Sequence, residues 1–272
     1  MTNNGVPNLP LKAFEGEDMF RRVTAFVYGV VCYAAFFGTF LYAAGFMGNF
    51  GVPKTMDSGP QVPFLQALLI NSLLLGLFAV QHSVMARPWF KNAWTRIVPP
   101  VIERSTYVLF SSLALLLLFW LWQPMGGVIW NVENPTGRLL LNAVYAIGLL
   151  TVLVTTFLIN HFDLFGLRQV WLYLIDRPYK SLGFVTPGPY RYVRHPLYVG
   201  WLLSFWAAPT MTAAHLVFAV ATTLYILVAI QLEEHDLVRS HREYEDYRRR
   251  VPMLIPVGSA KNREAAIERL VS

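Results

Sequence analysis

The residues with the clearest chemical character lie in two short stretches of the C-terminal half. The first is Gly188–Gly200, GPYRYVRHPLYVG, which combines aromatic, cationic and proline residues. The second is the adjacent pair Glu233 and Glu234, which closes a long apolar stretch. Ionisable groups near a membrane-spanning segment are costly and therefore mark candidate sites. A basic, aromatic loop joined to two carboxylates across apolar helices predicts a cofactor site.

The composition predicts an integral membrane protein. Hydrophobic residues make up 55% of the 272 residues and charged residues only 14%. The mean hydropathy is +0.44, whereas a soluble domain carries roughly 25% charged residues. Because apolar runs fill most of the chain, we expect one membrane-embedded domain over residues 1–272.

The spacing of the apolar runs predicts an all-α fold. A transmembrane helix needs about 20 apolar residues, and such runs cover approximately residues 23–46, 64–85, 107–122 and 139–159. A fifth region, 197–231, is interrupted at Ala207–Thr210 and reads as a helical hairpin with a short first leg. We therefore expect a polytopic transmembrane bundle: four spans within residues 23–160, then a loop, a C-terminal helical hairpin and a tail over 184–256.

The basic residues predict the orientation of the bundle. Lys and Arg are retained on the cytoplasmic side of membrane proteins, and they are concentrated before the first span, between spans two and three, and around the hairpin. We expect both termini and the site to be cytoplasmic, in a bacterial inner membrane. The net charge of +6 comes without a nucleic-acid-binding motif, so the expected basic contacts are with lipid.

Polar clusters at the cytoplasmic span ends supply candidate catalytic residues. His82 ends span two, and His161 and Asp163 follow span four. A histidine here is either part of a site or a core residue whose hydrogen bonds are satisfied. Neither His161 with Asp163 nor Glu233–His235 has the spacing typical of metal ligands, and Cys32 is the only cysteine. We therefore expect no metal.

Two adjacent glutamates at the end of a helix oppose its dipole. If the hairpin ends at Glu233 and Glu234, a cation should lie nearby. Arg191, Arg194 and a positively charged ligand all remain candidates for that cation.

The ordered motifs resemble the isoprenylcysteine carboxyl methyltransferase superfamily. The pattern Gly-Pro-Tyr-x-Tyr-x-Arg-His-Pro-x-Tyr-x-Gly is followed by an apolar hairpin, Glu-Glu and a tail with Tyr244, Tyr247 and Pro252. One departure is His241–Arg242, where the superfamily has Phe-Gly. The segments 81–87, 103–107 and 160–167 are similar to the membrane-bound bacterial methanethiol S-methyltransferases and the related NnrU-like proteins.

The resemblance implies S-adenosylmethionine as cofactor, with S-adenosylhomocysteine as product. It also implies a set of cofactor-binding residues in the loop, its preceding segment and the acidic pair: Val185, Gly188, Tyr190, Arg194, His195, Pro196, Leu197, Tyr198, Gly200, Glu233 and Glu234. Carboxylates, an arginine and aromatic rings are the groups that suit an amino acid tail, a sulfonium and an adenine.

The implied reaction moves a methyl group to a small thiol, most simply methanethiol, giving dimethyl sulfide. A thiol is mostly protonated near neutral pH, so a base is expected. His161, Asp163 and His82 are the candidates for the base or for orienting it, with His161 preferred because Asp163 follows closely. The alternatives are methylation of a prenylcysteine carboxylate or a lipid amine, and a non-enzymatic NnrU-like accessory role.

Overall fold

The computed structural model describes residues 19–256, and long helices dominate it. The long helices are α1 (Met19–Gly48), α2 (Phe64–Ala86), α4 (Pro100–Leu121), α5 (Pro135–Ile159) and α9 (Ala213–Ser240). Within the described residues, these five are long and apolar enough to cross a membrane. The expected all-α, polytopic bundle is confirmed.

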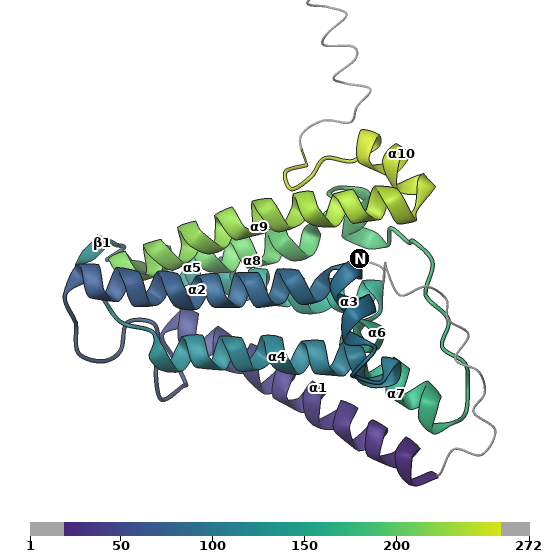
Figure 1. Cartoon of the computed structure of the whole chain (residues 1–272). Coiled ribbons are helices and arrows are strands. Elements are labelled where there is room, and N and C mark those ends of the chain that lie inside the picture. The colour runs from purple at the N-terminus through teal and green to yellow at the C-terminus, as the bar shows by residue number, and fades with distance from the viewer. Residues whose placement is uncertain (1–18, 257–272) are drawn as a thin grey trace, which may run out of the picture.

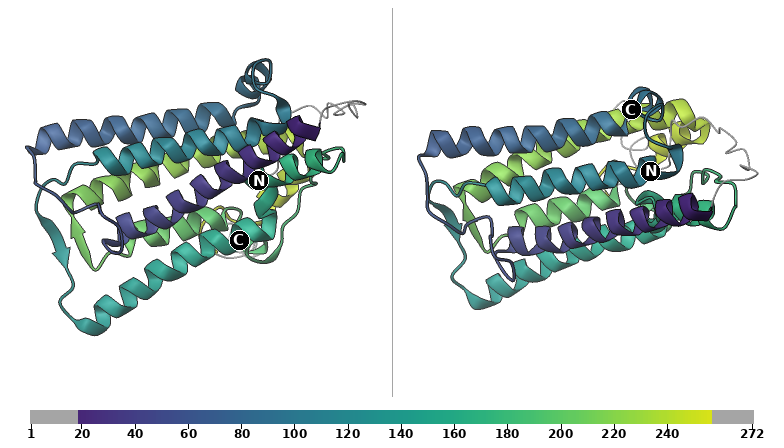
Figure 2. Two further views of the ribbon diagram at one scale, coloured as in Figure 1. Left: turned by 90° about the horizontal axis from the view of Figure 1, so that it is seen from below. Right: turned by 60° about the horizontal axis from the view of Figure 1, so that its bottom comes forward.

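Shorter elements join the long helices at the two ends of the bundle. The helices are α3 (Pro88–Trp94), α6 (His161–Leu164), α7 (Leu167–Leu174), α8 (Pro196–Trp206) and α10 (Arg242–Arg250), with a 3-10 turn η1 (Gly188–Arg191). The strands are β1 (Val128–Asn131) and β2 (Thr210–Thr212). The helices α3, α6, α7 and α10 lie at one end of the bundle and β1 at the other (Figure 1). The long helices run roughly side by side between these ends (Figure 2).

Local sequence signals explain where the helices begin. Pro100, Pro135 and Pro196 each occupy the first turn of a helix, where a missing N–H has no cost. The side chain of Asn134 accepts from the Gly137 amide and caps α5. Thr212 caps α9 in the same way, through the His215 amide. The third span begins seven residues earlier than the apolar run predicted.

The helical hairpin has one short and one long leg, as expected. Helix α8 has 11 residues, about 16 Å at 1.5 Å per residue, and so does not cross a bilayer by itself. After Trp206 the chain turns through β2, which pairs antiparallel with β1 through Trp130↔Met211 and Asn131↔Thr210. No sequence pattern indicated this two-stranded ribbon.

Helix α8 packs very closely against α5. A Cβ added to Gly200 would lie 2.7 Å from the Gly148 carbonyl oxygen, and one added to Gly148 would lie 2.6 Å from that of Gly200. Glycine permits this approach because it has no side chain, as in other membrane helix pairs. The contact fixes α8, and with it the loop that precedes α8.

One expectation about α9 is wrong. The helix continues to Ser240, so Glu233 and Glu234 do not end it and do not oppose its dipole. The polar extension stays helical because Leu237 packs with Tyr244 and Tyr247 in a small core under α10. Despite the departure at His241–Arg242, this tail is well packed: the Phe184 ring lies 5.5 Å from that of Tyr244.

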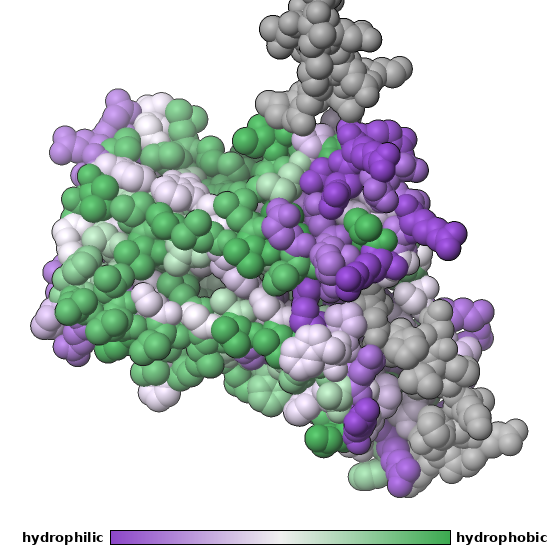
Figure 3. Space-filling view, turned by 45° about the horizontal axis from the view of Figure 1, so that its top comes forward, coloured by the Kyte–Doolittle hydropathy of each residue, from purple (hydrophilic) through white to green (hydrophobic). Residues whose placement is uncertain are grey.

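The surface of the bundle suits a lipid environment. Large apolar side chains on its flank are exposed, among them Leu65, Leu73, Val80 and Trp120. Hydrophobic residues cover this flank; the largest group of hydrophilic ones lies at the end that carries α10, and smaller groups lie at the opposite end (Figure 3). An exposed apolar area of this kind marks a membrane-facing surface.

Candidate active site

The cofactor loop and the acidic pair are brought together, as the sequence predicted. The Arg194 Nε lies 2.7 Å from Glu234 Oε1, and the His195 Nε2 lies 3.0 Å from the same oxygen. His195 is 2% exposed and Glu234 is 4% exposed. The Arg194 guanidinium therefore neutralises a buried carboxylate, which would otherwise be very costly there, and His195 adds a hydrogen bond.

Glu233 points in a different direction from Glu234. Adjacent side chains on a helix diverge, and the Tyr198 hydroxyl donates to Glu233 Oε2 at 3.1 Å. The other oxygen, Oε1, is buried and has no hydrogen-bond partner within residues 19–256. Glu233 lines a cavity between the helices, so this oxygen is suited to accept from a ligand.

The tail holds the loop in place. The Arg194 and His195 amides donate to the carbonyls of Pro252 and Met253, at 2.9 and 3.2 Å. The Tyr247 hydroxyl donates to the Tyr190 carbonyl at 2.6 Å. Gly188 begins the loop with a φ of +51°, which favours glycine.

Several buried polar atoms around the loop have no partner in the part of the chain that the structure describes. They are the Tyr190 hydroxyl, His195 Nδ1, Glu233 Oε1 and the Tyr244 hydroxyl. Burial is the main factor that raises the pKa of both tyrosines, so their hydroxyls stay protonated and can donate. Unsatisfied buried polar groups call for an explanation, and a bound ligand with polar groups supplies one.

The cavity has a volume of about 420 Å³, within the range of small-molecule sites. Leu197, Tyr198 and Glu233 contribute from α8 and α9. The polar residues that α2, α3 and α4 add are His82, Ser83, Arg87, Lys91, Arg104, Tyr107, Ser111 and Ser112. Apolar residues such as Phe119 and Phe218 line much of the rest. The cavity thus combines one polar end with an apolar body.

The remaining predicted cofactor residues lie outside the cavity lining. Arg194, His195 and Glu234 form a framework beside it, and Pro196 starts α8. Gly200 faces α5. Val185 is 56% exposed.

His82 lies inside the cavity lining. Its Nε2 is 3.0 Å from the Tyr107 hydroxyl, and its Nδ1 is 3.2 Å from Ser111 Oγ. This arrangement joins α2 and α4 on one wall of the cavity.

His161 also reaches the cavity, but hydroxyl groups occupy both of its ring nitrogens. The Tyr33 hydroxyl lies 2.9 Å from Nε2, and Thr156 Oγ1 lies 2.8 Å from Nδ1. The ring stacks on Phe157 at 4.1 Å. Burial lowers the pKa of His161, so its imidazole is neutral near pH 7. The geometry is that of a core histidine with satisfied hydrogen bonds.

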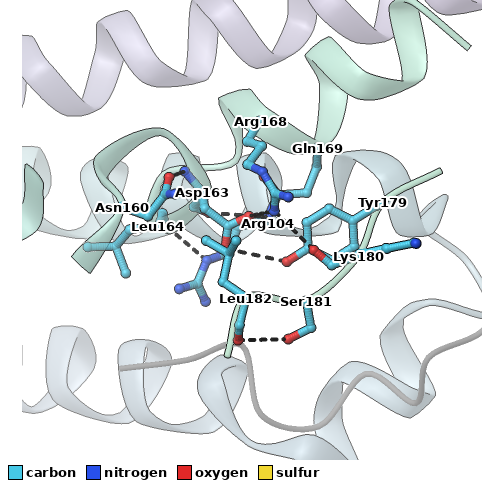
Figure 4. A network of polar contacts seen from close by, with 10 residues as sticks. All are labelled: Arg104, Asn160, Asp163, Leu164, Arg168, Gln169, Tyr179, Lys180, Ser181 and Leu182. Atoms are coloured by element: carbon cyan, nitrogen blue, oxygen red, sulfur yellow. Dashed lines mark hydrogen bonds and ion pairs between the residues drawn. The ribbon is translucent and has the colours of Figure 1, made fainter. Parts of the chain in front are cut away.

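Asp163 binds partners other than His161. Arg168 Nη1 lies 2.9 Å from its Oδ1, and Tyr179 donates to its Oδ2 at 3.4 Å. These contacts, with Arg104 donating to the Leu164 carbonyl, tie the segment 160–182 to α4 (Figure 4). Because Asp163 and His161 have separate hydrogen-bond partners, the pairing that favoured His161 as a base is not formed. Asp163 is also absent from the cavity lining.

No catalytic or binding role was assigned from the sequence to Lys91, Arg104, Tyr107 or Asp236, which also line the cavity. Arg87 Nη1 pairs with Asp236 Oδ2 at 2.8 Å and links α2 to α9. From the sequence, Lys91 was interpreted only as one of the basic residues that indicate the orientation of the bundle in the membrane. One sequence signal could have marked Lys91 as a candidate site residue: it follows Arg87 by four residues and stands between Trp89 and Trp94. Within residues 19–256, no three His, Cys, Asp or Glu side chains gather closely enough to hold a metal ion.

Comparisons with known proteins identify the family of the chain. The family described as phospholipid methyltransferase matches residues 143–243. The methanethiol S-methyltransferase of Crocosphaera subtropica is 61% identical over 236 residues, covering 86% of this chain and 92% of the relative. The chain belongs to the methanethiol S-methyltransferase family.

Other members and relatives align over similar lengths. The methanethiol S-methyltransferase of Mycobacterium tuberculosis is 53% identical over 237 residues, covering 87% of this chain and 97% of the relative. Nurim from Rattus norvegicus is 32% identical over 205 residues, covering 69% and 78%. No solved structure matches the chain significantly.

Membership of the methanethiol S-methyltransferase family confirms the resemblance drawn from the motifs. The phospholipid methyltransferase match spans most of α5 and all of α8 and α9. It therefore includes the predicted cofactor motif, Gly188–Gly200 with Glu233 and Glu234. The methanethiol S-methyltransferase relatives extend over most of the chain. Their similarity therefore includes the α2–α4 wall of the cavity.

Proposed function

We propose that the protein transfers a methyl group from S-adenosylmethionine to methanethiol, forming dimethyl sulfide and S-adenosylhomocysteine. The observation that carries the proposal is the position of Glu233. This acid belongs to the cofactor motif, lines the cavity and leaves one buried oxygen unpaired. The family relatives named methanethiol S-methyltransferase support the choice of acceptor.

The unpaired polar atoms suit the proposed methyl donor. Glu233 Oε1 can accept from an ammonium group in the cavity. The Tyr190 and Tyr244 hydroxyls lie beside the cavity and outside its lining, and they can donate to a carboxylate or a ribose of a ligand that extends past it. Arg194 uses Nε on Glu234 and Nη1 on the Arg248 and Val251 carbonyls. It therefore acts as a support for Glu234. When bound, the donor supplies a methyl group attached to a positively charged sulfur.

The apolar body of the cavity suits a small apolar thiol. Exclusion of water strengthens electrostatic interactions inside the site, and positioning supplies much of the acceleration of a displacement reaction. His82, with Tyr107 and Ser111, contributes polar groups at the end where the acceptor sulfur is expected. His161 instead joins α6 to α1 and α5, through Tyr33 and Thr156.

We also infer that this end of the bundle faces the cytoplasm of a bacterial cell. Arg87, Lys91, Arg104, Arg194 and Arg248 lie on α3, α10 or the adjoining ends and loops, and such residues are retained inside. The cofactor is made in the cytoplasm of cells, so this orientation gives the cavity access to it.

The deciding experiment measures dimethyl sulfide by gas chromatography. Membranes containing the protein are given methanethiol and S-adenosylmethionine, and a Glu233→Gln variant serves as the inactive control. We expect dimethyl sulfide from the wild type and at least a tenfold lower rate from the variant. A parallel reaction uses methyl-labelled donor with a phospholipid extract. Label in lipid without dimethyl sulfide would replace the proposal with lipid methylation, and failure to bind S-adenosylhomocysteine would favour an accessory role.

A further inference from the structure

A lysine that the cofactor motif does not include lines the cavity from α3. Lys91 is 3% exposed, although lysine is almost never fully buried unless it is paired. Within residues 19–256, its ammonium forms no hydrogen bond or ion pair. A buried, unpaired amine that reaches a cavity is a candidate for direct contact with a ligand.

The charged neighbours of Lys91 come from three directions. Arg87 precedes α3 and is held by Asp236 of α9 at 2.8 Å. Arg104 of α4 is held by the Leu164 carbonyl at 2.8 Å. Glu103 of α4 is 3% exposed, and its Oε1 has no partner in the described part of the chain. Two cations and two acids therefore surround the amine.

These surroundings make the neutral form of the Lys91 amine easier to reach than it is in an exposed lysine. Burial lowers the pKa of Lys91 most, and the positive charge of Arg104 has the next largest effect. Together with Arg87, these two effects outweigh the opposing effects of Glu103 and Asp236, and the pKa of Lys91 is about 8. A lysine in this range can exchange protons near neutral pH, whereas an arginine cannot.

The two histidines of the cavity are less suited to that task. Both nitrogens of His161 have hydroxyl partners. Both nitrogens of His82 lie within 3.2 Å of a hydroxyl, from Tyr107 or Ser111. Lys91 reaches the cavity from α3, whereas the cofactor motif reaches it from α8 and α9. A donor held by the motif therefore leaves Lys91 available to the acceptor.

We propose that Lys91 is the general base that takes the proton of the acceptor thiol. This inference rests on the proposed function. The S–H bond breaks as the neutral amine gains the proton, which leaves a thiolate beside the new ammonium. The thiolate sulfur forms a bond to the methyl carbon while the bond from that carbon to the sulfonium sulfur breaks, and its electron pair stays on the departing sulfur. Lys91 then releases the proton to water.

The test compares pH profiles of kcat/KM for methanethiol. Wild type, Lys91→Arg and Lys91→Met are assayed between about pH 6 and 9.5, with Lys180→Met as an exposed-lysine control. Because the reaction needs the neutral amine, the wild-type value rises with pH and levels off above an inflection near 8. Lys91→Arg stays protonated and Lys91→Met has no amine, so both lose this inflection and fall about 10²-fold or more. Lys180→Met retains the wild-type profile.

A binding measurement separates this role from cofactor binding and from misfolding. Calorimetry with S-adenosylhomocysteine should give affinities within about twofold of wild type for both Lys91 variants, because the lysine faces the acceptor. A retained inflection near 8 in Lys91→Arg would overturn the inference. So would a tenfold loss of S-adenosylhomocysteine affinity in both variants, which would place Lys91 on the donor. A wild type that forms no dimethyl sulfide refutes the proposed function itself, and is recognised before any variant is compared.

Discussion

At the scale of single residues, Glu234 connects the two halves of the cofactor motif. It accepts from Arg194 and His195 and is nearly inaccessible to solvent. Its neighbour Glu233 faces the cavity. Two identical residues, adjacent in the chain, therefore have different tasks: one fixes the loop and the other is available to a ligand.

Replacement of Glu234 by Gln should weaken both the fold and cofactor binding. Removing one partner of a buried ion pair costs about 3–5 kcal/mol because the remaining charge is left unpaired. We expect at least a tenfold loss in S-adenosylhomocysteine affinity by calorimetry and a lower unfolding temperature. Glu245→Gln is the matched control, since Glu245 pairs with Arg249 on the surface, where such pairs contribute little. Equal affinities for both variants would refute the framework role.

His161 provides a test of pH dependence. Burial holds its folded pKa below the ordinary 6.5, so the unfolded chain takes up a proton at a higher pH than the folded protein does. The contribution of neutral His161 to the free energy of unfolding is then complete above about pH 6.5. It is lost progressively as the pH falls below that value. Thermal unfolding in detergent from pH 7.5 to 5 should show this decrease for wild type. The His161→Gln variant should show a smaller decrease in unfolding temperature over the same pH range. An identical decrease in both proteins would exclude His161 as the cause.

At the scale of elements, the α5–α8 contact decides where the cofactor loop lies. Gly148 and Gly200 let the two backbones meet, and the tail carbonyls of Pro252 and Met253 secure the loop from the other side. The spacing of apolar residues predicted the hairpin. The register of α8 against α5 depends on two glycines, which have no side chain. The periodicity of apolar residues does not reveal such a contact.

Substitution of Gly200 by Ala should disturb this contact. The added methyl would meet backbone atoms of α5 at less than 3.0 Å, and overpacking of this kind costs about 1–3 kcal/mol. We expect a lower unfolding temperature in detergent together with weaker S-adenosylhomocysteine binding. Gly76→Ala in α2 is the control, because nothing lies within 4 Å of its added Cβ. Unchanged stability of Gly200→Ala would mean that α8 can move away from α5 without cost.

At the scale of the whole molecule, the polar and apolar surfaces are separated along the bundle axis. The largest group of hydrophilic side chains lies around α10, and the flank is apolar (Figure 3). The cavity is lined at one end by Arg87, Lys91, Arg104 and Asp236. A protein of this shape presents its charged end to water and its flank to lipid.

Cysteine labelling should establish the orientation. The native Cys32 is fully buried, so single exposed cysteines can be introduced at Glu245 in α10 and at Glu133 beside β1. In intact spheroplasts, a membrane-impermeant maleimide should label Glu133→Cys. It should label Glu245→Cys only after permeabilisation. The reverse pattern would place the candidate active site outside the cytoplasm.

The sequence alone determined the solvent in which this chain folds and its helical spans, and it predicted a ligand-binding motif, because hydrophobic length and local residue order are recorded directly in the chain. The pairing of the Arg194–His195 loop with Glu234 was foreseen because both segments flank one hairpin. Only the tertiary structure separated the roles of Glu233 and Glu234, gave His161 and Asp163 other partners, and brought Lys91 to the cavity. These facts depend on which side chains from distant helices meet in space, and on burial, and neither is a property of local sequence.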